Sequence, residues 1–263
     1  MLPRPIAALE GERLRRVSGV IFDVDDTVTE GGRLCPQAFD AMHRLADAGV
    51  QLVAATGRPL GWARVIYQHW PLRAAIGENG AGWFWESEAG VQVTFFSSES
   101  ERSQHARRLE ELQEAVRTAM PAVRLSEDCD LRRCDIAFDI GERFQLAAHE
   151  RTRLRELILD AGLDVTESSV HMHAIPGPWD KAKAIKRVLK EVLEEPFEAN
   201  AAAWAYVGDS PNDAPAFGLV PLSVGVRNVL ESSPGPDPMP QFITEHARGE
   251  GFAEFARRVL GAR

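Results

Sequence analysis

The sequence predicts an α/β fold, namely a doubly wound, Rossmann-like parallel-sheet core with an inserted α+β cap domain. In the first 82 residues, apolar β-branched runs alternate with amphipathic helices, which is the pattern of a parallel sheet covered by helices. The same alternation returns after residue 178. Between these parts the pattern changes to short strand-like pieces around two helical stretches. We therefore predict a core of residues 1–82 and 178–263 and a cap of residues 83–177.

The first part of the core contains three expected strands and two helices. One helix begins near Pro36, which suits a first turn, and ends at Gly49. A second helix opens with Pro59 in its first turn. The strands are apolar runs too short for helices, and they lie at residues 17–25, 50–56 and 73–82. This order predicts parallel strands joined by helical crossovers.

The inserted segment has its own apolar positions. One helix is expected near residues 100–120, and a second carries leucine, isoleucine and alanine on one face before Gly162. Trp83 and Trp85 alternate onto the same face of a strand, so we expect them to pack the insert onto the sheet. The strand pieces GWFWE, VQVTFF, CDIAFDI and SSVHMHAI complete a small core.

The alternating pattern then resumes. Asp180 is placed to cap a helix, and the runs WAYVGDS and LSVGV predict two more buried strands. The last helix has an apolar face that includes Phe252 and Phe255. The proline-rich segment ESSPGPDPMP is expected to be a loop.

Composition limits the class of protein. With 44% hydrophobic and 26% charged residues in 263, the chain is typical of soluble globular proteins. It lacks the run of about 20 apolar residues that a membrane helix needs, and its N-terminus lacks a secretory apolar stretch, so we expect a cytoplasmic protein with no membrane partner. The net charge of −9 argues against nucleic acid. Cys35, Cys129 and Cys134 favour neither disulfides nor zinc.

The acidic residues carry the first chemical signal. Asp23 and Asp25 end one strand, and Asp209 ends another, with Asp213 just beyond. Because the carboxyl ends of parallel strands share one edge, we expect these four carboxylates to meet there. They would repel one another unless a cation lay among them. Oxygen ligands at a phosphate-handling site point to Mg²⁺.

Groups that could hold a phosphate follow the second strand. Thr56 ends this strand, and Gly57 and Arg58 open the next helix. A hydroxyl with free backbone N–H groups at a helix N-terminus forms an anion site. Lys181, in the first turn of its own helix, adds a point charge.

Four segments in this order resemble the motifs of the haloacid dehalogenase-like (HAD) phosphatase superfamily. They are DVDDT at 23–27, ATGRP at 55–59, the lysine of WDKAKAI, and GDSPND at 208–213. ENGA at 78–81, before a long insert, resembles the type IIB or Cof-like branch, which includes sucrose-phosphate and mannosylphosphoglycerate phosphatases. Asp26 departs from the pattern, since many relatives carry glycine there, and we therefore expect a different local turn geometry.

The resemblance implies roles for individual residues. Asp23 would be the nucleophile that becomes phosphorylated, and Asp25 the general acid and base. The phosphoryl oxygens would be held by Thr56, Gly57, Lys181 and Asn212. The metal ligands would be Asp23, Asp25 through its backbone carbonyl, Asp209, and Asp213 directly or in an outer position. A cap would close over the substrate and select its leaving group.

Substrate contacts are less determined. Arg58, Arg132, Arg133, His171 and His173 are the candidates, all able to meet an anionic or polyol substrate. Arg132 and Arg133 could instead be simply exposed charges, without a role in binding. The two histidines could instead be ordinary surface residues. Likewise, Lys181 could be a helix-surface lysine and Asp213 a helix cap.

The function predicted is thus a Mg²⁺-dependent phosphatase for a small phosphorylated metabolite, a sugar or polyol phosphate, acting through a phospho-aspartate. A phosphomutase of the phosphomannomutase type would use the same parts, and a catalytically silent phosphometabolite-binding protein would keep the fold. A dehalogenase fits poorly, because Asp25 and the pair Asp209 and Asp213 suit phosphate and metal. The sequence leaves the substrate's identity and the oligomeric state open.

Overall fold

The computed structural model describes residues 2–168, 170–231 and 235–263. Its largest element is a nine-stranded sheet in the order β1-β14-β13-β12-β2-β5-β6-β7-β8. All neighbouring pairs from β1 to β6 are parallel, as predicted. The strands are β1 (Arg4–Pro5), β2 (Gly19–Phe22), β5 (Gln51–Ala55), β6 (Ala74–Gly77), β7 (Gly82–Ser87), β8 (Gly90–Phe95), β12 (Trp204–Gly208), β13 (Leu222–Gly225) and β14 (Phe242–Ile243).

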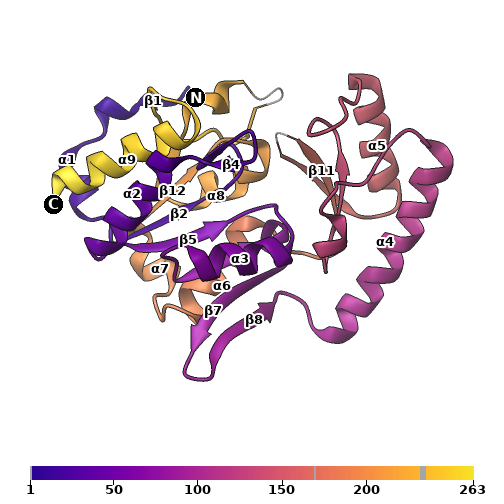
Figure 1. The fold of residues 1–263 in the computed structure, drawn as a ribbon, viewed down its shortest axis with the longest axis horizontal. Helices are drawn as coiled ribbons and strands as arrows, with labels where there is room; N and C mark the ends of the chain where they lie inside the picture. Colours follow the sequence, from indigo (N-terminus) through magenta and orange to yellow (C-terminus); the bar gives the residue numbers. More distant parts are fainter. Residues whose placement is uncertain (1, 169, 232–234) are drawn as a thin grey trace.

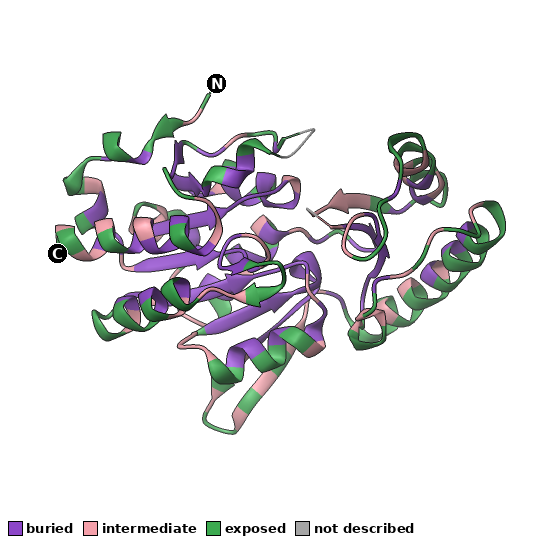
Figure 2. Ribbon diagram, turned by 45° about the horizontal axis from the view of Figure 1, so that its top comes forward, coloured by how far each residue is buried: buried purple, intermediate pink, exposed green. Residues whose placement is uncertain are grey.

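Helices cover both faces of this sheet (Figure 1). Alternate residues of β2 serve the two faces: Val20 and Phe22 pack into one apolar cluster and Ile21 into the other. The first cluster receives α1 (Gly11–Arg15), α2 (Pro36–Asp47), α3 (Leu60–His69) and α9 (Arg248–Ala262). The second receives α6 (Lys181–Glu191), α7 (Phe197–Asn200) and α8 (Ala214–Leu219). The doubly wound α/β prediction is confirmed, and the central strands are buried throughout (Figure 2).

A second sheet lies beside the first (Figure 1). It has three antiparallel strands in the order β10-β11-β9, and two long helices pack on one of its faces in a third apolar cluster. The elements are α4 (Glu99–Ala119), β9 (Ile136–Asp139), α5 (Ala148–Asp160), β10 (Asp164–Glu167) and β11 (His171–Ile175). Met172 and Ala174 of β11 face these helices, so His171 and His173 occupy the opposite face.

Two expectations about the start of the insert differ from the structure. Strands β7 and β8, which we assigned to the insert, pair antiparallel at the edge of the nine-stranded sheet. Trp83 is fully buried in that sheet's second apolar cluster, with Trp85 against it, so the two tryptophans do not pack the insert onto the sheet. The division at residues 82/83 and 177/178 stays a prediction; the separate sheet begins only with β9.

Local signals of the sequence explain several element boundaries. The Asp180 side chain accepts the backbone N–H of Lys183 and caps α6, and Gly49 ends α2 at a φ of 79°. Pro59 stands one position before α3, as its N-cap. A two-stranded ribbon, β3 (Thr29–Glu30) and β4 (Arg33–Leu34), follows β2. Residues 232–234 of the proline-rich segment and Ser169 of the piece SSVHMHAI lie outside the described residues.

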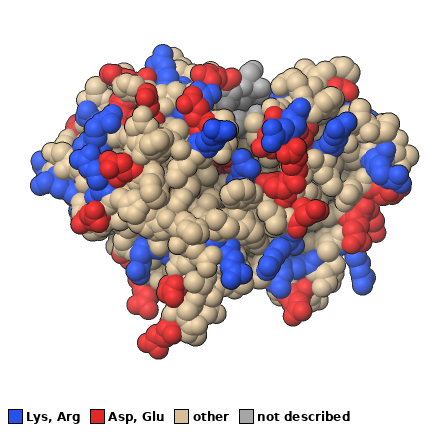
Figure 3. Space-filling model, viewed as in Figure 1, with Lys and Arg blue, Asp and Glu red and all other residues tan. Residues whose placement is uncertain are grey.

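Surface charge agrees with the acidic composition. On the face shown in Figure 3, acidic and basic side chains are interspersed rather than gathered into one basic area. Such a face lacks the continuous positive surface that nucleic-acid backbones require. Among the helices within the described ranges, none combines the length and apolar character of a membrane span.

Candidate active site

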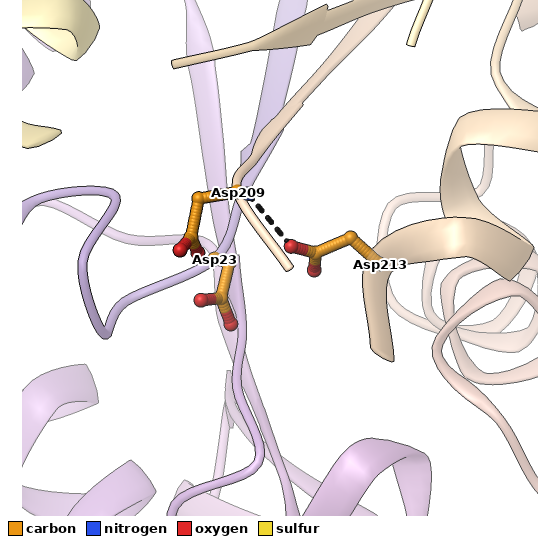
Figure 4. A group of neighbouring side chains, drawn as sticks. All are labelled: Asp23, Asp209 and Asp213. Carbon is orange, nitrogen blue, oxygen red and sulfur yellow. Dashed lines mark hydrogen bonds between the residues drawn. The ribbon is translucent and has the colours of Figure 1, made fainter. Parts of the chain in front are cut away.

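Three buried aspartates meet at the carboxyl edge of the large sheet. Strands β2 and β12 are parallel neighbours, so Asp23 and Asp209 follow them at the same edge, and Asp213 arrives from the turn Pro211–Asp213. One carboxylate oxygen from each lies within 4.8 Å of the others. Figure 4 shows the side chains of Asp23 and Asp209 at the two strand ends, with Asp213 beside them. Three of the four acids that we expected to converge therefore meet, whereas the Asp25 carboxylate lies outside the group and binds Arg58.

Their closeness is electrostatically costly. Burial raises the pKa of Asp23 to about 8, although Lys181 acts in the opposite direction. Burial, followed by the charges of Asp23 and Asp213, raises the pKa of Asp209 well above its usual value. Among the described residues, this group has ion pairs only with Lys181, so one positive charge faces three acids. An oxygen-only donor set with uncompensated negative charge fits a hard divalent cation such as Mg²⁺.

Lys181 is built into this group. It is the first residue of α6 and is 1% exposed, so the alternative of a helix-surface lysine is wrong. Its Nζ lies 2.6 Å from Asp23 Oδ1, 2.6 Å from Asp213 Oδ1 and 3.3 Å from Asn212 Oδ1. Since burial without partners would favour the neutral amine, it is the two carboxylates that keep this lysine charged.

Asp213 has a full set of donors. Its Oδ2 accepts the backbone N–H groups of Asp209, at 2.8 Å, and Ser210, at 3.0 Å. Its Oδ1 accepts from Lys181 and from the Tyr206 hydroxyl, at 2.5 Å. The capping alternative is met only in part: Asp213 is the N-cap residue of α8, but its side chain accepts no N–H of that helix and binds the preceding N–H groups instead. Direct metal binding by Asp213 stays a prediction.

Asp209 is held by two side chains that the sequence reasoning did not single out. Thr27 Oγ1 donates to Asp209 Oδ1 at 3.2 Å, and Asn228 Nδ2 donates to Asp209 Oδ2 at 3.1 Å. Asn228 Nδ2 also reaches the carbonyl of Asp26, at 2.9 Å. Thr27 belongs to the DVDDT segment and could have been noticed, whereas nothing in the sequence around Asn228 signals this contact.

Asp25 faces a different partner. Its carboxylate binds Arg58 through both Nε and Nη2, with distances of 2.7 to 3.0 Å. Arg58 also lies 3.4 Å from Asp128 and 3.8 Å from Glu142, two acids of the inserted segment. The predicted metal role of Asp25 through its backbone carbonyl stays a prediction. Asp26, which departs from the motif that the sequence resembles, adopts a φ of 53°, a left-handed conformation that aspartate tolerates better than most residues.

The expected phosphate-binding loop is tightly surrounded. Thr56 is fully buried after β5, and its hydroxyl accepts the backbone N–H of Arg58 at 3.0 Å. A methyl group on Gly57 would lie 3.1 Å from Asn79 Oδ1, 3.3 Å from His173 Nε2 and 3.4 Å from Asn212 Nδ2. A side chain at this position would therefore crowd polar groups from three segments, each of which would have to shift by a few tenths of an ångström.

The ENGA segment provides a second link to the insert. Glu78 and Asn79 have φ values of 48° and 54°, a strain that persists only where the surroundings impose it. The buried Glu78 carboxylate accepts backbone N–H groups from Leu60, Arg133 and Cys134, at 2.9, 2.9 and 2.6 Å. The strained loop therefore joins α3 to the start of the segment that leads into β9.

The predicted substrate residues fall in different places. His171 and His173 are buried and border the same small pocket as Asp23 and Asp25, so an ordinary surface position is wrong for both. The Arg132 side chain is 1% exposed and pairs with Asp135, so it is not a surface arginine. Arg133 is exposed and borders neither the small pocket nor the large cleft.

The space around these residues has two parts. A cleft of about 830 Å³ runs between the large sheet and the insert, bordered by acids such as Asp25, Asp128 and Glu142 together with Arg58. Next to Asp23 the pocket holds only about 10 Å³, less than one water molecule requires. In the arrangement described, the space next to Asp23 is therefore too small for a phosphoester.

Comparison with known proteins agrees with the fold and the motifs. Residues 20–118 match the model of the haloacid dehalogenase-like hydrolase family. A phosphoglycolate phosphatase from Pyrobaculum aerophilum is 26% identical over 244 residues, covering 92% of this chain and 95% of that protein. The sucrose-phosphatase of Synechocystis, solved with sucrose and phosphate, aligns with a TM-score of 0.65 at 18% identity, covering 93% of this chain and 98% of that one. The structure of a HAD/COF-like hydrolase from Plasmodium vivax aligns with a TM-score of 0.69 at 14% sequence identity. The alignment covers 97% of this chain and 100% of that one.

Fold, motifs and relatives thus define a phosphatase of phosphorylated small molecules. The match of residues 20–118 to the haloacid dehalogenase-like hydrolase model, together with the phosphoglycolate phosphatase relative, confirms the resemblance drawn from the four motifs. The two solved structures, at identities below 25%, show that the chain shares the fold of the Cof-like branch.

Proposed function

We propose that this protein is a Mg²⁺-dependent phosphatase that hydrolyses a sugar or polyol phosphate through a phospho-aspartate on Asp23. The observation that carries the proposal is the grouping of Asp23, Asp209 and Asp213 around a single buried lysine. Such a group has the charge and the oxygen ligands for a divalent cation, and the lysine offers a donor to a phosphoryl oxygen.

In the proposed mechanism, a carboxylate oxygen of Asp23 attacks phosphorus, and the P–O bond to the leaving group breaks. Asp25 gives a proton to the departing oxygen and then takes one from the water that hydrolyses the acyl phosphate. Lys181 and Asn212 hold phosphoryl oxygens, together with Thr56 and Gly57. Release of inorganic phosphate returns Asp23 to a carboxylate.

Mg²⁺ would be held by Asp23, Asp209 and the carbonyl of Asp25, with Asp213 in or just outside the ligand set, and it would neutralise charge on the transferred phosphoryl group. Arg58 would orient the Asp25 carboxyl, since it binds both its oxygens. Within residues 83–177, the part that carries α4, α5 and the three-stranded sheet would act as a cap whose closure excludes water other than the attacking one.

The leaving group is proposed from two kinds of support. The cleft beside Asp25 is bordered by several carboxylates, which suits hydroxyl-rich neutral groups better than anions. The Synechocystis structure contains sucrose with phosphate, whereas the Pyrobaculum relative is named for phosphoglycolate. The test therefore includes both sugar phosphates and 2-phosphoglycolate.

The proposal is tested by measuring phosphate released from a panel of sugar phosphates, polyol phosphates and 2-phosphoglycolate, with and without Mg²⁺. We expect turnover of one or more polyol or sugar phosphates only with Mg²⁺, and none with Asp23→Asn. Transfer of phosphate within the substrate, without release, would indicate a phosphomutase instead. Full activity of Asp23→Asn, or no turnover across the panel, would contradict the proposal.

A further inference from the structure

His173 presents a polar atom that has no hydrogen-bond partner among the described residues. The side chain is 1% exposed, yet its Nε2 is unpaired. This nitrogen lies 3.3 Å from the position that a methyl group on Gly57 would occupy, and the residue borders the pocket that contains Asp23 and Asp25. A buried imidazole nitrogen without a partner, facing the reaction site, calls for an explanation.

The other ring nitrogen fixes what Nε2 can do. His173 Nδ1 lies 3.1 Å from Asp135 Oδ2, which can only accept, and 3.5 Å from Arg132 Nη1, which can only donate. The carboxylate contact is the shorter one, and Arg132 Nη1 already donates to Asp135 Oδ1 at 2.8 Å. Nδ1 therefore carries the proton, and in the neutral ring Nε2 is left with a lone pair. The same contact with Arg132 balances the charge of Asp135.

The surroundings favour the neutral ring. Burial lowers the pKa of His173 to about 4, and the charge of Arg132 and the neighbouring His171 act in the same direction. The hydrogen bond and the charge of Asp135 raise the pKa of His173, but by less than the other effects lower it. Near neutral pH, Nε2 is thus an acceptor and needs a partner that brings a hydrogen.

The segment that carries Asp135 is anchored to the catalytic core. Glu78 accepts the backbone N–H of Cys134 at 2.6 Å and that of Asp135 at 3.2 Å. Arg132 donates to the carbonyl of Gly57 at 3.1 Å. These contacts place His173 at a defined position relative to the expected phosphate loop when the insert is closed.

We propose that His173, oriented by Asp135, accepts a hydrogen bond from a hydroxyl group of the leaving group and so selects hydroxyl-bearing phosphate esters. This inference rests on the phosphatase function proposed above and adds the residue that chooses among its substrates. A deprotonated carboxylate has no hydrogen to offer this lone pair, so His173 does not favour 2-phosphoglycolate. Asp135 is a positioning residue that sets the tautomer.

The test compares two esters that differ in their hydroxyl groups, glycerol 1-phosphate and propyl phosphate, with Mg²⁺ present. We expect kcat/KM for glycerol 1-phosphate to exceed that for propyl phosphate by roughly threefold to tenfold, the value of one neutral hydrogen bond. His173→Leu should bring this ratio close to one. His149→Leu, which removes an exposed histidine of α5, should leave it unchanged. A ratio near one in the wild type, or an unchanged ratio in His173→Leu, overturns the inference.

A second variant covers the case in which His173→Leu does not fold. In Asp135→Asn the amide can donate to Nδ1, which moves the ring proton to Nε2 and makes it a donor. We expect turnover of 2-phosphoglycolate relative to glycerol 1-phosphate to rise severalfold. Unchanged selectivity in this variant counts against His173. Failure of the wild type to hydrolyse any ester of the full panel would instead reject the proposed phosphatase function, whereas turnover of other esters with no preference for hydroxyl-bearing ones overturns this inference alone.

A spectroscopic measurement needs no substrate. A long-range ¹H–¹⁵N spectrum of the wild-type protein at neutral pH should show His173 Nδ1 protonated and Nε2 unprotonated, with the pattern exchanged in Asp135→Asn. A protonated Nε2 in the wild type overturns the inference whatever the kinetics give.

Discussion

Lys181 Nζ lies 2.6 Å from Asp23 Oδ1, although 158 positions separate the two residues in the chain. The contact joins the end of β2 to α6, the helix that follows the insert. It brings the expected nucleophile next to the expected phosphate ligand before any substrate is present. The arrangement also has an energetic consequence, because both groups are buried and each depends on the other for charge balance.

Lys181→Met should therefore destabilise the protein strongly. Removing the lysine leaves Asp23 and Asp213 buried without their cation, and breaking a buried pair in this way costs on the order of 3–5 kcal/mol. Denaturant unfolding without metal measures the loss. Lys190→Met, at an exposed position of the same helix, should change stability by less than about 0.5 kcal/mol. Equal stability of the two variants would contradict the proposed dependence.

Mg²⁺ should stabilise the native protein measurably. A ligand that binds only the folded state adds about 2.7 kcal/mol at a concentration of 100 times its Kd, so the thermal midpoint should rise by several degrees. Asp209→Asn should lose most of this shift, because it removes a charged oxygen ligand from the group of three. Asp40→Asn, an exposed acid of α2, serves as the control. A shift that persists in Asp209→Asn would place the ion elsewhere.

His173 should make stability fall in mild acid. Its pKa is lowered from 6.5 to about 4 in the folded protein, so between these values the unfolded chain binds more protons. The stability that the neutral ring provides is complete above pH 6.5 and is lost as pH falls toward 4, with a slope of up to about 1.4 kcal/mol per pH unit. Unfolding free energies of the wild type and His173→Gln should therefore converge as pH decreases. Parallel pH curves would show that His173 titrates normally.

Arg58 should influence activity through Asp25. Arg58→Lys keeps the charge but loses the two-nitrogen contact with the carboxylate, and arginine and lysine are not equivalent at such sites. We expect kcat to fall by roughly tenfold or more, in the range assigned to general acid–base catalysis, and the acidic limb of the kcat profile to move. Arg117→Lys, in an exposed pair on α4, is the matched control. Unaltered kcat in Arg58→Lys would remove Arg58 from the mechanism.

Much of this fold could be read from the sequence because local patterns and global structure agree. The runs that became β2, β5 and β12 are continuous and apolar, as strands buried on both faces are, and the acids after them mark the edge of the sheet. The grouping of Asp23, Asp209 and Asp213 follows from the parallel order of those strands. The departure of Asp26 from the resembled motif predicted an altered turn, and Asp26 has a positive φ.

Other features depend on tertiary contacts that no local pattern encodes. Strands β7 and β8 have the short, alternating character of the insert, and only their pairing with β6 assigns them to the large sheet. Burial of Arg132 and His173 arises because Asp135 balances one and orients the other. Asn228 reaches Asp209 from a turn after β13, a contact that sequence spacing cannot reveal.

The central claim is that Asp23 carries the phosphoryl group during turnover. The most direct measurement is rapid acid quenching of the enzyme with Mg²⁺ and a turned-over phosphate ester, followed by mass spectrometry of the peptides. We predict an acyl phosphate on Asp23 that hydroxylamine removes and that is absent from Asp23→Asn. Steady turnover with no phosphopeptide at Asp23, or with phosphate on another side chain, would contradict this account.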